Sequence, residues 1–199
     1  SGKNASGLGH FATVHGDVWR VSGIDESLTE LRWKRLATGL FQPLGVKGIN
    51  DRVYVTGRDQ ITVLHDTNGD GETDYYESLN NQADVSANGH EYVTNLEQDS
   101  QGWLYFLKGD SGGVTAHDGS LLRTSPDGQQ LEVFATGIRN GNGLSIGPGD
   151  VMTASPQEGN WTPSSSILEI HQGGFYGMMQ VHHRTVMPTM SGGYRPPAR

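Results

Sequence analysis

Residues 61–79 read ITVLHDTNGDGETDYYESL. Before the acidic stretch, Ile61 and Val63 alternate with Thr62 and Leu64, and two adjacent tyrosines follow the stretch. β-Branched and aromatic residues in such an arrangement are typical of strands. The Asn-Gly and Asp-Gly pairs between these runs are strong signals for a tight hairpin turn. The segment therefore predicts a β-hairpin whose tip is residues 66–74.

Side chains that carry oxygen occur at alternate positions of this tip. Their spacing matches positions one, three and five of a calcium-binding loop, and a glycine follows where such a loop turns sharply. Position twelve is Glu77, but its strand can turn it away, and Asp74 is then expected to close the site. The predicted metal ligands are Asp66, Asn68, Asp70, Glu72 through its carbonyl, Asp74 and, as the less favoured substitute, Glu77.

A hairpin tip closed by Asx turns without a metal is the alternative interpretation of the same residues. Several carboxylates crowded into one turn repel one another unless a cation offsets their charge. This repulsion favours Ca²⁺ as a cofactor.

Composition narrows the class of protein. With 29 glycines and only 34% hydrophobic residues among 199, the chain favours short strands and tight turns over long helices. A net charge of −8 argues against a nucleic-acid partner, which requires clustered cations. No apolar run approaches the ~18 residues that a membrane span needs. The absence of cysteine excludes disulfides, thiolate metal sites and covalently attached haem within these residues.

One short motif occurs twice. The sequence ATGL at residues 37–40 returns as ATGI at 135–138, an offset of 135 − 37 = 98, which is twice about 49. A period in the forties, made of four short strands, is typical of propeller blades. We therefore expect an all-β chain of β-propeller blades, each with four antiparallel strands. The chain accommodates about half a blade, two blades over residues 41–138, and a last blade ending near Gly177.

Propellers typically need four or more blades to close, so we expect an incomplete ring, as in a fragment or a subunit. The predicted boundaries are a flexible leader at 1–15, the blades at 16–178 and an extended tail rich in proline and glycine at 179–199. Uncovered strand edges invite pairing. Another chain or domain is therefore expected to complete the propeller.

Further strands are expected at residues 90–97 and 103–107, and a hairpin turn at Pro126-Asp127-Gly128. Three tryptophans, Trp19, Trp33 and Trp103, lie in predicted strands and are interpreted as packing residues. Trp161 instead lies in a predicted loop and is a candidate for stacking on a sugar ring. His182 and His183 are adjacent on an extended segment, where their side chains point to opposite sides, which argues against a shared metal.

Five stretches together resemble a known family: GDVWRV at 16–21, RWKRLATGLFQPLGV at 32–46, VYVTGRDQITVLHDTNGDGETDYYES at 53–78, LEVFATGIRNGNGL at 131–144 and GNWTPSSSILEIHQGGFYG at 159–177. The chain resembles the glucose/sorbosone-dehydrogenase-like β-propellers. It is most similar to the secreted propeller proteins of planctomycete-type bacteria, in which the propeller is often joined to a c-type cytochrome module.

The resemblance implies oxidation of a sugar or alcohol by pyrroloquinoline quinone, with electrons passing to a cytochrome-type acceptor. It implies His90 as the general base, Asp110 as the residue that polarises it, and Arg139, Asn140 and Asn142 as contacts to the quinone. A histidine suits the first role because its pKa lies near neutrality. Arginine suits contact with the quinone because its fork binds carboxylates at two points.

The sequence also departs from the family pattern. Glu91 and Tyr92 follow His90 in place of a small glycine-rich stretch, and Gly141 stands where a proline is usual. Taken alone, His90 is equally a structural histidine at a strand end, and Arg139 and Asn140 a turn between blades. Two functions thus remain: a quinone-dependent dehydrogenase, or a non-catalytic propeller that binds carbohydrate or a partner subunit. A calcium loop of modest affinity favours a periplasmic or secreted location.

Overall fold

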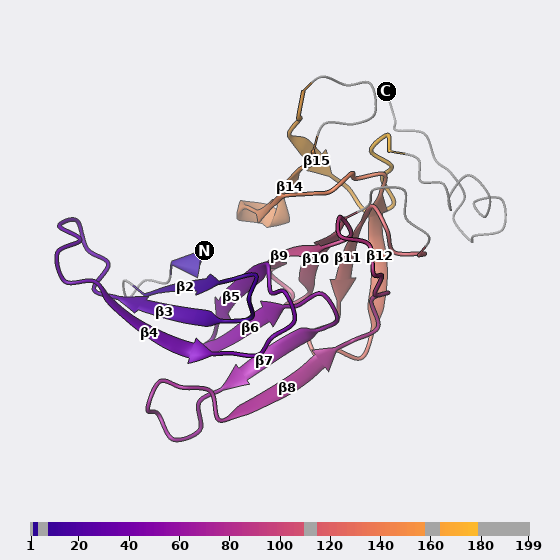
Figure 1. Ribbon diagram of the computed structural model, residues 1–199. Helices are drawn as coiled ribbons and strands as arrows, with labels where there is room; N and C mark the ends of the chain where they lie inside the picture. The colour runs from indigo at the N-terminus through magenta and orange to yellow at the C-terminus, as the bar shows by residue number, and fades with distance from the viewer. Residues whose placement is uncertain (1, 4–7, 110–114, 158–163, 179–199) are drawn as a thin grey trace. The chain divides into compact units, whose positions relative to one another are not determined.

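The computed structural model describes residues 2–3, 8–109, 115–157 and 164–178 (Figure 1). Within these ranges the chain forms four antiparallel sheets, and the only helical element is the short 3-10 turn η1, Pro148–Asp150. Three of the sheets have four strands, each arranged in sequence order as a meander. The expected all-β fold of four-stranded antiparallel propeller blades is confirmed, and among the described strands no sheet closes on itself.

The chain divides into two compact units, Ser1–Asn81 and Gln82–Arg199. The strands of the first unit are β1 (Gly2–Lys3), β2 (Gly9–Ala12), β3 (Val18–Ser22) and β4 (Arg32–Ala37) in its first sheet, and β5 (Gly45–Ile49), β6 (Arg52–Thr56), β7 (Ile61–His65) and β8 (Tyr75–Asn80) in its second. Buried side chains from both sheets form one apolar cluster that includes Val18, Leu36, Val55 and Leu64. Burying such a side chain contributes about 1.5–3 kcal/mol, so this cluster holds the two sheets together.

The first sheet begins earlier than the sequence indicated. Residues 1–15 were expected to form a flexible leader, followed by about half a blade, but β2 lies within them and pairs with β3 over Gly9↔Val21 to Ala12↔Val18. The strand is only four residues long, and because it contains glycine and histidine it shows no clear alternation of apolar and polar residues. Phe11 nevertheless lies directly opposite Trp19. Pairing across the sheet thus identifies a strand that the sequence periodicity does not reveal.

The hairpin predicted from residues 61–79 is confirmed. Strands β7 and β8 pair from Ile61↔Asn80 to His65↔Tyr75, and residues 66–74 connect them. The connection also contacts the first sheet, because the Thr73 N–H donates to the Leu36 carbonyl at 2.8 Å. The tip of the second blade is therefore hydrogen-bonded to the outer strand of the first.

The second unit contains the third blade, β9 (Val93–Gln98), β10 (Leu104–Lys108), β11 (Ser120–Thr124) and β12 (Leu131–Thr136), and a three-stranded sheet of β13 (Gly143–Ile146), β14 (Met152–Ser155) and β15 (Leu168–Ile170). Its apolar cluster joins Leu107 and Leu121 of the third blade to Met152 and Ile170 of the last sheet. The hairpin with its turn at 126–128 is confirmed by the pairing of β11 with β12. The strand expected from residue 90 instead starts at Val93, which leaves His90 in the preceding turn.

The repeated ATG motif occupies the same place in two blades. Each copy lies at the end of the fourth strand, β4 or β12, and its glycine has a positive φ, 80° at Gly39 and 78° at Gly137. The offset of 98 residues is therefore two blades, as the sequence indicated.

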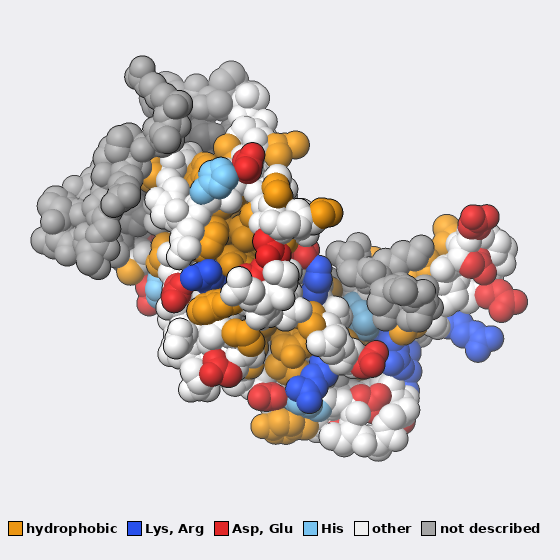
Figure 2. Space-filling model, turned by 180° about the vertical axis from the view of Figure 1, so that it is seen from behind, with side chains coloured by type: hydrophobic (Ala, Val, Ile, Leu, Met, Phe, Trp, Pro, Cys, Tyr) orange, Lys and Arg blue, Asp and Glu red, His pale blue; other side chains and the backbone are white. Residues whose placement is uncertain are grey.

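Charged side chains gather on the connection between β3 and β4, which projects from its own sheet and bears Asp25, Glu26 and Glu30 (Figure 2).

The described residues contain no helix with the length and hydrophobicity needed to cross a membrane.

The two repeated glycines provide a matched test of packing. A Cβ at Gly137 would lie 2.8 Å from the Phe175 ring, whereas a Cβ at Gly39 would meet no atom within 4 Å. Both substitutions with alanine incur the cost of a positive φ, about 1–3 kcal/mol. We expect Gly137→Ala to lower the free energy of unfolding by roughly 1–3 kcal/mol more than Gly39→Ala, because only the former overpacks a neighbour. Urea denaturation of both variants measures the difference, and equal losses would contradict this assignment.

Candidate functional site

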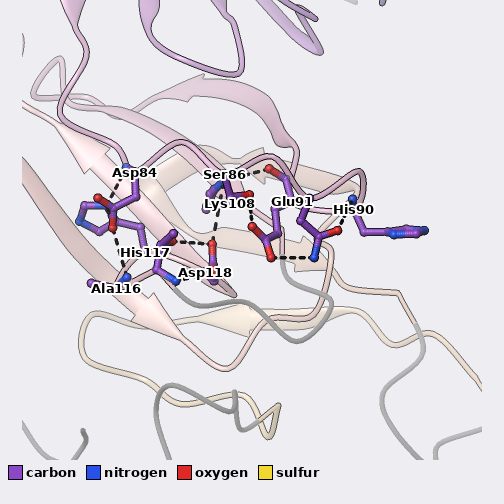
Figure 3. A network of polar contacts seen from close by, with 10 residues as sticks. Asp84, Ser86, His90, Glu91, Lys108, Ala116, His117 and Asp118 are labelled. Carbon is purple, nitrogen blue, oxygen red and sulfur yellow. Dashed lines mark hydrogen bonds and ion pairs between the residues drawn. The ribbon is translucent and has the colours of Figure 1, made fainter.

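His90 lies in an exposed turn just before β9. Its backbone N–H donates to Oδ1 of Asn88 at 3.1 Å, which fixes the backbone of the turn. The imidazole ring itself points away from the surrounding polar network (Figure 3). The turn therefore presents a histidine whose ring nitrogens are accessible to a ligand.

The next residue, Glu91, is directed inward and is only 1% exposed. Its carboxylate accepts hydrogen bonds from the Ser86 hydroxyl and from Nδ2 of Asn88, the latter at 3.0 Å. A buried carboxylate requires such donors, because transfer of an unpaired charge out of water is very costly. Glu91 thus fastens the two ends of the segment that carries His90.

Lys108, at the end of β10, is fully buried beneath this turn. Its Nζ donates to the Glu91 carbonyl at 2.9 Å and lies 3.9 Å from Oδ1 of Asp118. Asp118 is itself buried and accepts hydrogen bonds from the Thr115 N–H at 2.9 Å and hydroxyl at 2.7 Å. Lysine, aspartate and the Glu91 carbonyl therefore form one buried network that connects the His90 turn to β10 and to the start of β11 (Figure 3).

A second attachment lies at the other end of the same segment. The Asp84 N–H donates to Nδ1 of His117 at 3.0 Å, and the Asp84 carboxylate accepts the Ala116 N–H at 3.1 Å. The chain from Asp84 to Glu91 is thus tied to the third blade at both ends.

Gly109 brings His90 and Asn140 together. A Cβ at this glycine would lie 2.7 Å from Oδ1 of Asn140 and 3.0 Å from the His90 carbonyl oxygen. Both residues therefore approach the end of β10 closely, and only glycine leaves room for them. The structure thus brings the His90 backbone close to the Asn140 side chain, while the His90 ring points away from the polar network.

The remaining predicted contacts lie near Asn140. Arg139 is half-buried, and Nδ2 of Asn140 donates to the side chain of Gln157 at 3.3 Å. Asn142 is exposed, and its N–H donates to the Ser155 carbonyl at 3.0 Å, so its backbone belongs to the sheet while its side chain is accessible. Asp110, Trp161, His182 and His183 lie outside the described residues.

The oxygens of the calcium-type loop are engaged in hydrogen bonds with the loop's own backbone. The two Asp66 oxygens accept from the N–H groups of Gly69 and Gly71, Asn68 Oδ1 from Asp70, and Asp70 Oδ1 from Glu72, each at 2.8 Å. These bonds orient the side chains at positions one, three and five of the loop. The plain Asx-turn alternative uses the same bonds.

The two candidate closing carboxylates have different environments. Asp74 accepts hydrogen bonds from the Thr67 hydroxyl and N–H, both at 2.8 Å, and these donors hold its pKa below the usual value. Glu77 lies in β8, where its carboxylate is 2.7 Å from Nε2 of His65. Asp74 therefore closes the loop on itself, while Glu77 is engaged elsewhere.

Two cations already contact the loop. Lys34 Nζ donates to the Asp70 carbonyl and lies 3.6 Å from the Glu72 carboxylate, and the Arg20 guanidinium lies against Gly71. Across the described ranges, no group of three or more His, Asp or Glu side chains converges as a metal site.

Sequence reasoning missed the buried network. Glu91 appeared only as a departure from the family pattern, and Lys108 and Asp118 were not singled out. One signal was available, because the run LYFLKGD places a lysine in a strand that is otherwise apolar. A charge inside such a run is expected to be paired.

Comparison with solved structures identifies the fold. The fold is similar to an oxidoreductase described as a glucose dehydrogenase from Thermus thermophilus, with a TM-score of 0.69 and 18% identity over 98% of this chain and 67% of that one. It is also similar to the soluble aldose sugar dehydrogenase of Escherichia coli in its apo form, with a TM-score of 0.65 and 13% identity over 87% and 60%. The pyranose dehydrogenase PQQ domain of Coprinopsis cinerea gives a TM-score of 0.56 and 10% identity over 84% and 49%.

The chain is thus a β-propeller with the fold of the sugar dehydrogenases, and it spans about two thirds or less of each of these structures. The family model of a domain of unknown function, DUF7133, matches residues 32–186, and the chain belongs to that family. No curated protein matches the sequence.

The buried network predicts an asymmetric effect of mutation. Lys108→Met leaves the Asp118 carboxylate buried without its cation, and removal of one partner from a buried pair costs about 3–5 kcal/mol. The exposed pair of Lys34 with Glu72 is the control, since Lys34→Met should change the free energy of unfolding by at most about 1 kcal/mol.

Chemical denaturation of the two variants tests this expectation. The double variant Lys108→Met/Asp118→Asn should recover part of the loss, because it removes the uncompensated charge. Similar stability of Lys108→Met and the wild type would show that the network does not hold the His90 turn.

Proposed function

We propose that this chain is part of a propeller enzyme that oxidises a sugar or an alcohol with pyrroloquinoline quinone, His90 acting as general base. The observation that carries the proposal is the exposed His90 imidazole on a turn that the buried Lys108 network fastens and whose backbone lies near Asn140. A general base must be accessible and must be carried on a well-held backbone, and the exposed ring and the fastened turn support these two requirements. The similarity of the fold to sugar dehydrogenases supports the same class of reaction.

The residues fit a cofactor with carboxylate and carbonyl oxygens. Arg139 supplies a cation, and Asn140 and Asn142 supply amide groups, while the Glu91 carboxylate is directed inward onto Ser86 and Asn88. Arginine is well matched to carboxylates because its planar fork donates two parallel hydrogen bonds. Further cationic contacts would come from the part of the propeller that this chain does not supply.

In the proposed reaction, His90 accepts the hydroxyl proton of the substrate at a ring nitrogen. The substrate carbon loses a hydride at the same time, so that an alcohol becomes a carbonyl compound and two electrons leave. Pyrroloquinoline quinone, when bound, would supply the acceptor for that hydride. The Asn88 and Lys108 contacts keep the His90 backbone fixed during the proton transfer, and a c-type cytochrome is the proposed next electron acceptor.

An exposed aromatic pair favours a partner that completes the propeller. The rings of Phe11 and Trp33 lie 5.3 Å apart on the first sheet, and these side chains are 39% and 56% exposed. Large aromatic residues left in water on a sheet face are typical of an interaction surface. We propose that an additional blade, from another domain or chain, covers this face.

The dehydrogenase proposal predicts a selective loss of turnover. His90→Gln should lower kcat by a factor of ~10² or more, as expected for a positioned base, while quinone binding is retained. His15→Gln, at an exposed histidine in the other unit, is the control and should have no effect. Dye-linked oxidation of a panel of sugars and alcohols by the full protein, with added quinone, measures turnover, and quinone-dependent thermal shift measures binding.

Two results would count against it. Unchanged turnover in His90→Gln would remove this residue from the base role. Neither turnover nor a thermal shift in the wild type would leave the non-catalytic propeller, which binds carbohydrate or a partner subunit, as the better interpretation.

We also propose that the loop 66–74 binds Ca²⁺ through Asp66, Asn68, Asp70, the Glu72 carbonyl and Asp74. The hydrogen bonds that preorient the first three side chains support this proposal, because oriented oxygens suit a hard cation. The positive charge of Lys34 beside the loop repels a bound cation, so the expected calcium affinity is modest. Modest affinity suits an extracytoplasmic location, periplasmic or secreted, where calcium is abundant.

Metal removal tests the calcium proposal. Calcium at about a hundred times its dissociation constant should add on the order of 2.7 kcal/mol to the stability of the protein. Chelator should therefore lower Tm, Asp70→Ala should abolish that sensitivity, and Lys34→Met should tighten calcium binding because a competing cation is gone. Identical melting curves of the wild type in chelator and in excess calcium would assign the loop as a plain Asx turn.

A further inference from the structure

A cavity of about 270 Å³ lies within the first unit, and its lining residues all come from that unit. Its apolar wall is formed by three aliphatic side chains of β4, β6 and β7. Its polar groups are Arg20, Asp51, Arg52, His65, Asp66 and Thr67. The volume is near the lower end of ligand sites, and it suits a molecule about the size of a monosaccharide.

The two arginines are the unusual feature of this cavity. Among the described residues, neither guanidinium of Arg20 and Arg52 forms an ion pair or a side-chain hydrogen bond, whereas Arg123 is paired with Glu132 at 2.6 Å and Arg58 donates to Gln42 at 2.9 Å. Arg20 is half-buried, and a partly buried guanidinium normally has acceptors for its five N–H groups. Both arginines therefore have donors to offer to a ligand in the cavity.

The charge of Arg20 also acts on its neighbour. His10 lies opposite Arg20 in the sheet and is buried, and its pKa is lowered first by burial and then by the positive charge of Arg20. Arg20 therefore brings positive charge to this point of the unit.

The two carboxylates of the cavity differ in their hydrogen-bond partners. Both oxygens of Asp66 already accept hydrogen bonds from the backbone N–H groups of Gly69 and Gly71, so this carboxylate is engaged within the loop. Asp51 lies on the exposed turn before β6 and has no hydrogen bond within the described residues. An unengaged carboxylate accepts hydrogen bonds only, and in this cavity it would pair with hydroxyl groups of a ligand.

We propose that this cavity binds a small hydroxylated oxyanion, in which a carboxylate or phosphate group contacts Arg20 and Arg52 and a hydroxyl group donates to Asp51. Two guanidinium groups recognise either kind of oxyanion through paired N–H donors. The aliphatic wall packs against the carbon skeleton. The site is separate from the proposed dehydrogenase centre and requires neither quinone nor calcium.

Binding is measured by isothermal titration calorimetry of the full protein in chelator, without quinone, with gluconate, glucose 6-phosphate, inorganic phosphate and glucose as four separate probes. At least one of the two anionic sugars should bind with a Kd in the millimolar range or tighter. Comparison of gluconate with glucose 6-phosphate identifies the preferred oxyanion. Glucose, which lacks the charge, should bind at least tenfold more weakly than the preferred probe.

Matched variants locate the site. Arg20→Gln and Arg52→Gln should each weaken binding of the preferred probe about tenfold or more, since each removes charged hydrogen-bond donors to the oxyanion. Arg32→Gln, at an exposed arginine of β4 outside the cavity, should leave binding unchanged. Thermal melts of all three variants verify that they fold.

Three results would overturn the proposal. The first is that neither anionic sugar binds. The second is that folded Arg20→Gln and Arg52→Gln bind the preferred probe as tightly as the wild type. The third is that Arg32→Gln loses as much affinity as these two variants. Equal binding of inorganic phosphate and glucose 6-phosphate would overturn the hydroxyl contact to Asp51. Because no step depends on turnover, these outcomes are independent of the dehydrogenase proposal.

Discussion

A four-stranded sheet has two faces and no interior, so each blade of this chain is stable only where it packs against another. The two apolar clusters show how this constraint is met within each unit, where Val18 and Leu36 meet Val55 and Leu64, and Leu107 and Leu121 meet Met152 and Ile170. The functional features follow from the same packing. Turns and hairpin tips that leave a packed pair of sheets are held rigidly at their bases, which allows polar residues on them to be positioned.

The structure separates two ways of holding polar groups in position. The His90 turn depends on a buried, charged network in which Lys108 neutralises Asp118 and binds the Glu91 carbonyl. The loop 66–74 depends on exposed hydrogen bonds between short polar side chains and nearby N–H groups. The first arrangement is costly to disturb because its charges are out of water, and the second is adaptable because water can replace any one bond.

Much of the fold could be predicted from the sequence because hairpins are specified locally. The alternation at Ile61 and Val63 and the turn chemistry after Asp66 are sufficient for one hairpin, and the repeated ATG motif fixes the blade period. Strand β2 could not be predicted in this way, since its four residues acquire strand character only when Phe11 meets Trp19. The start of β9 was misjudged for a related reason: Glu91 is held by Ser86, Asn88 and Lys108 before the ladder begins, and local propensity does not contain those contacts.

The hydrogen bond from Thr73 to Leu36 has a consequence for the order of folding. It joins residues from two blades, and its formation closes a long stretch of chain, which is entropically unfavourable until both sheets exist. The tip of the second hairpin therefore acquires its final conformation late, after β4 is in place. During synthesis, when β4 emerges before β7 and β8, we expect the first sheet to act as the template on which the acidic loop is ordered.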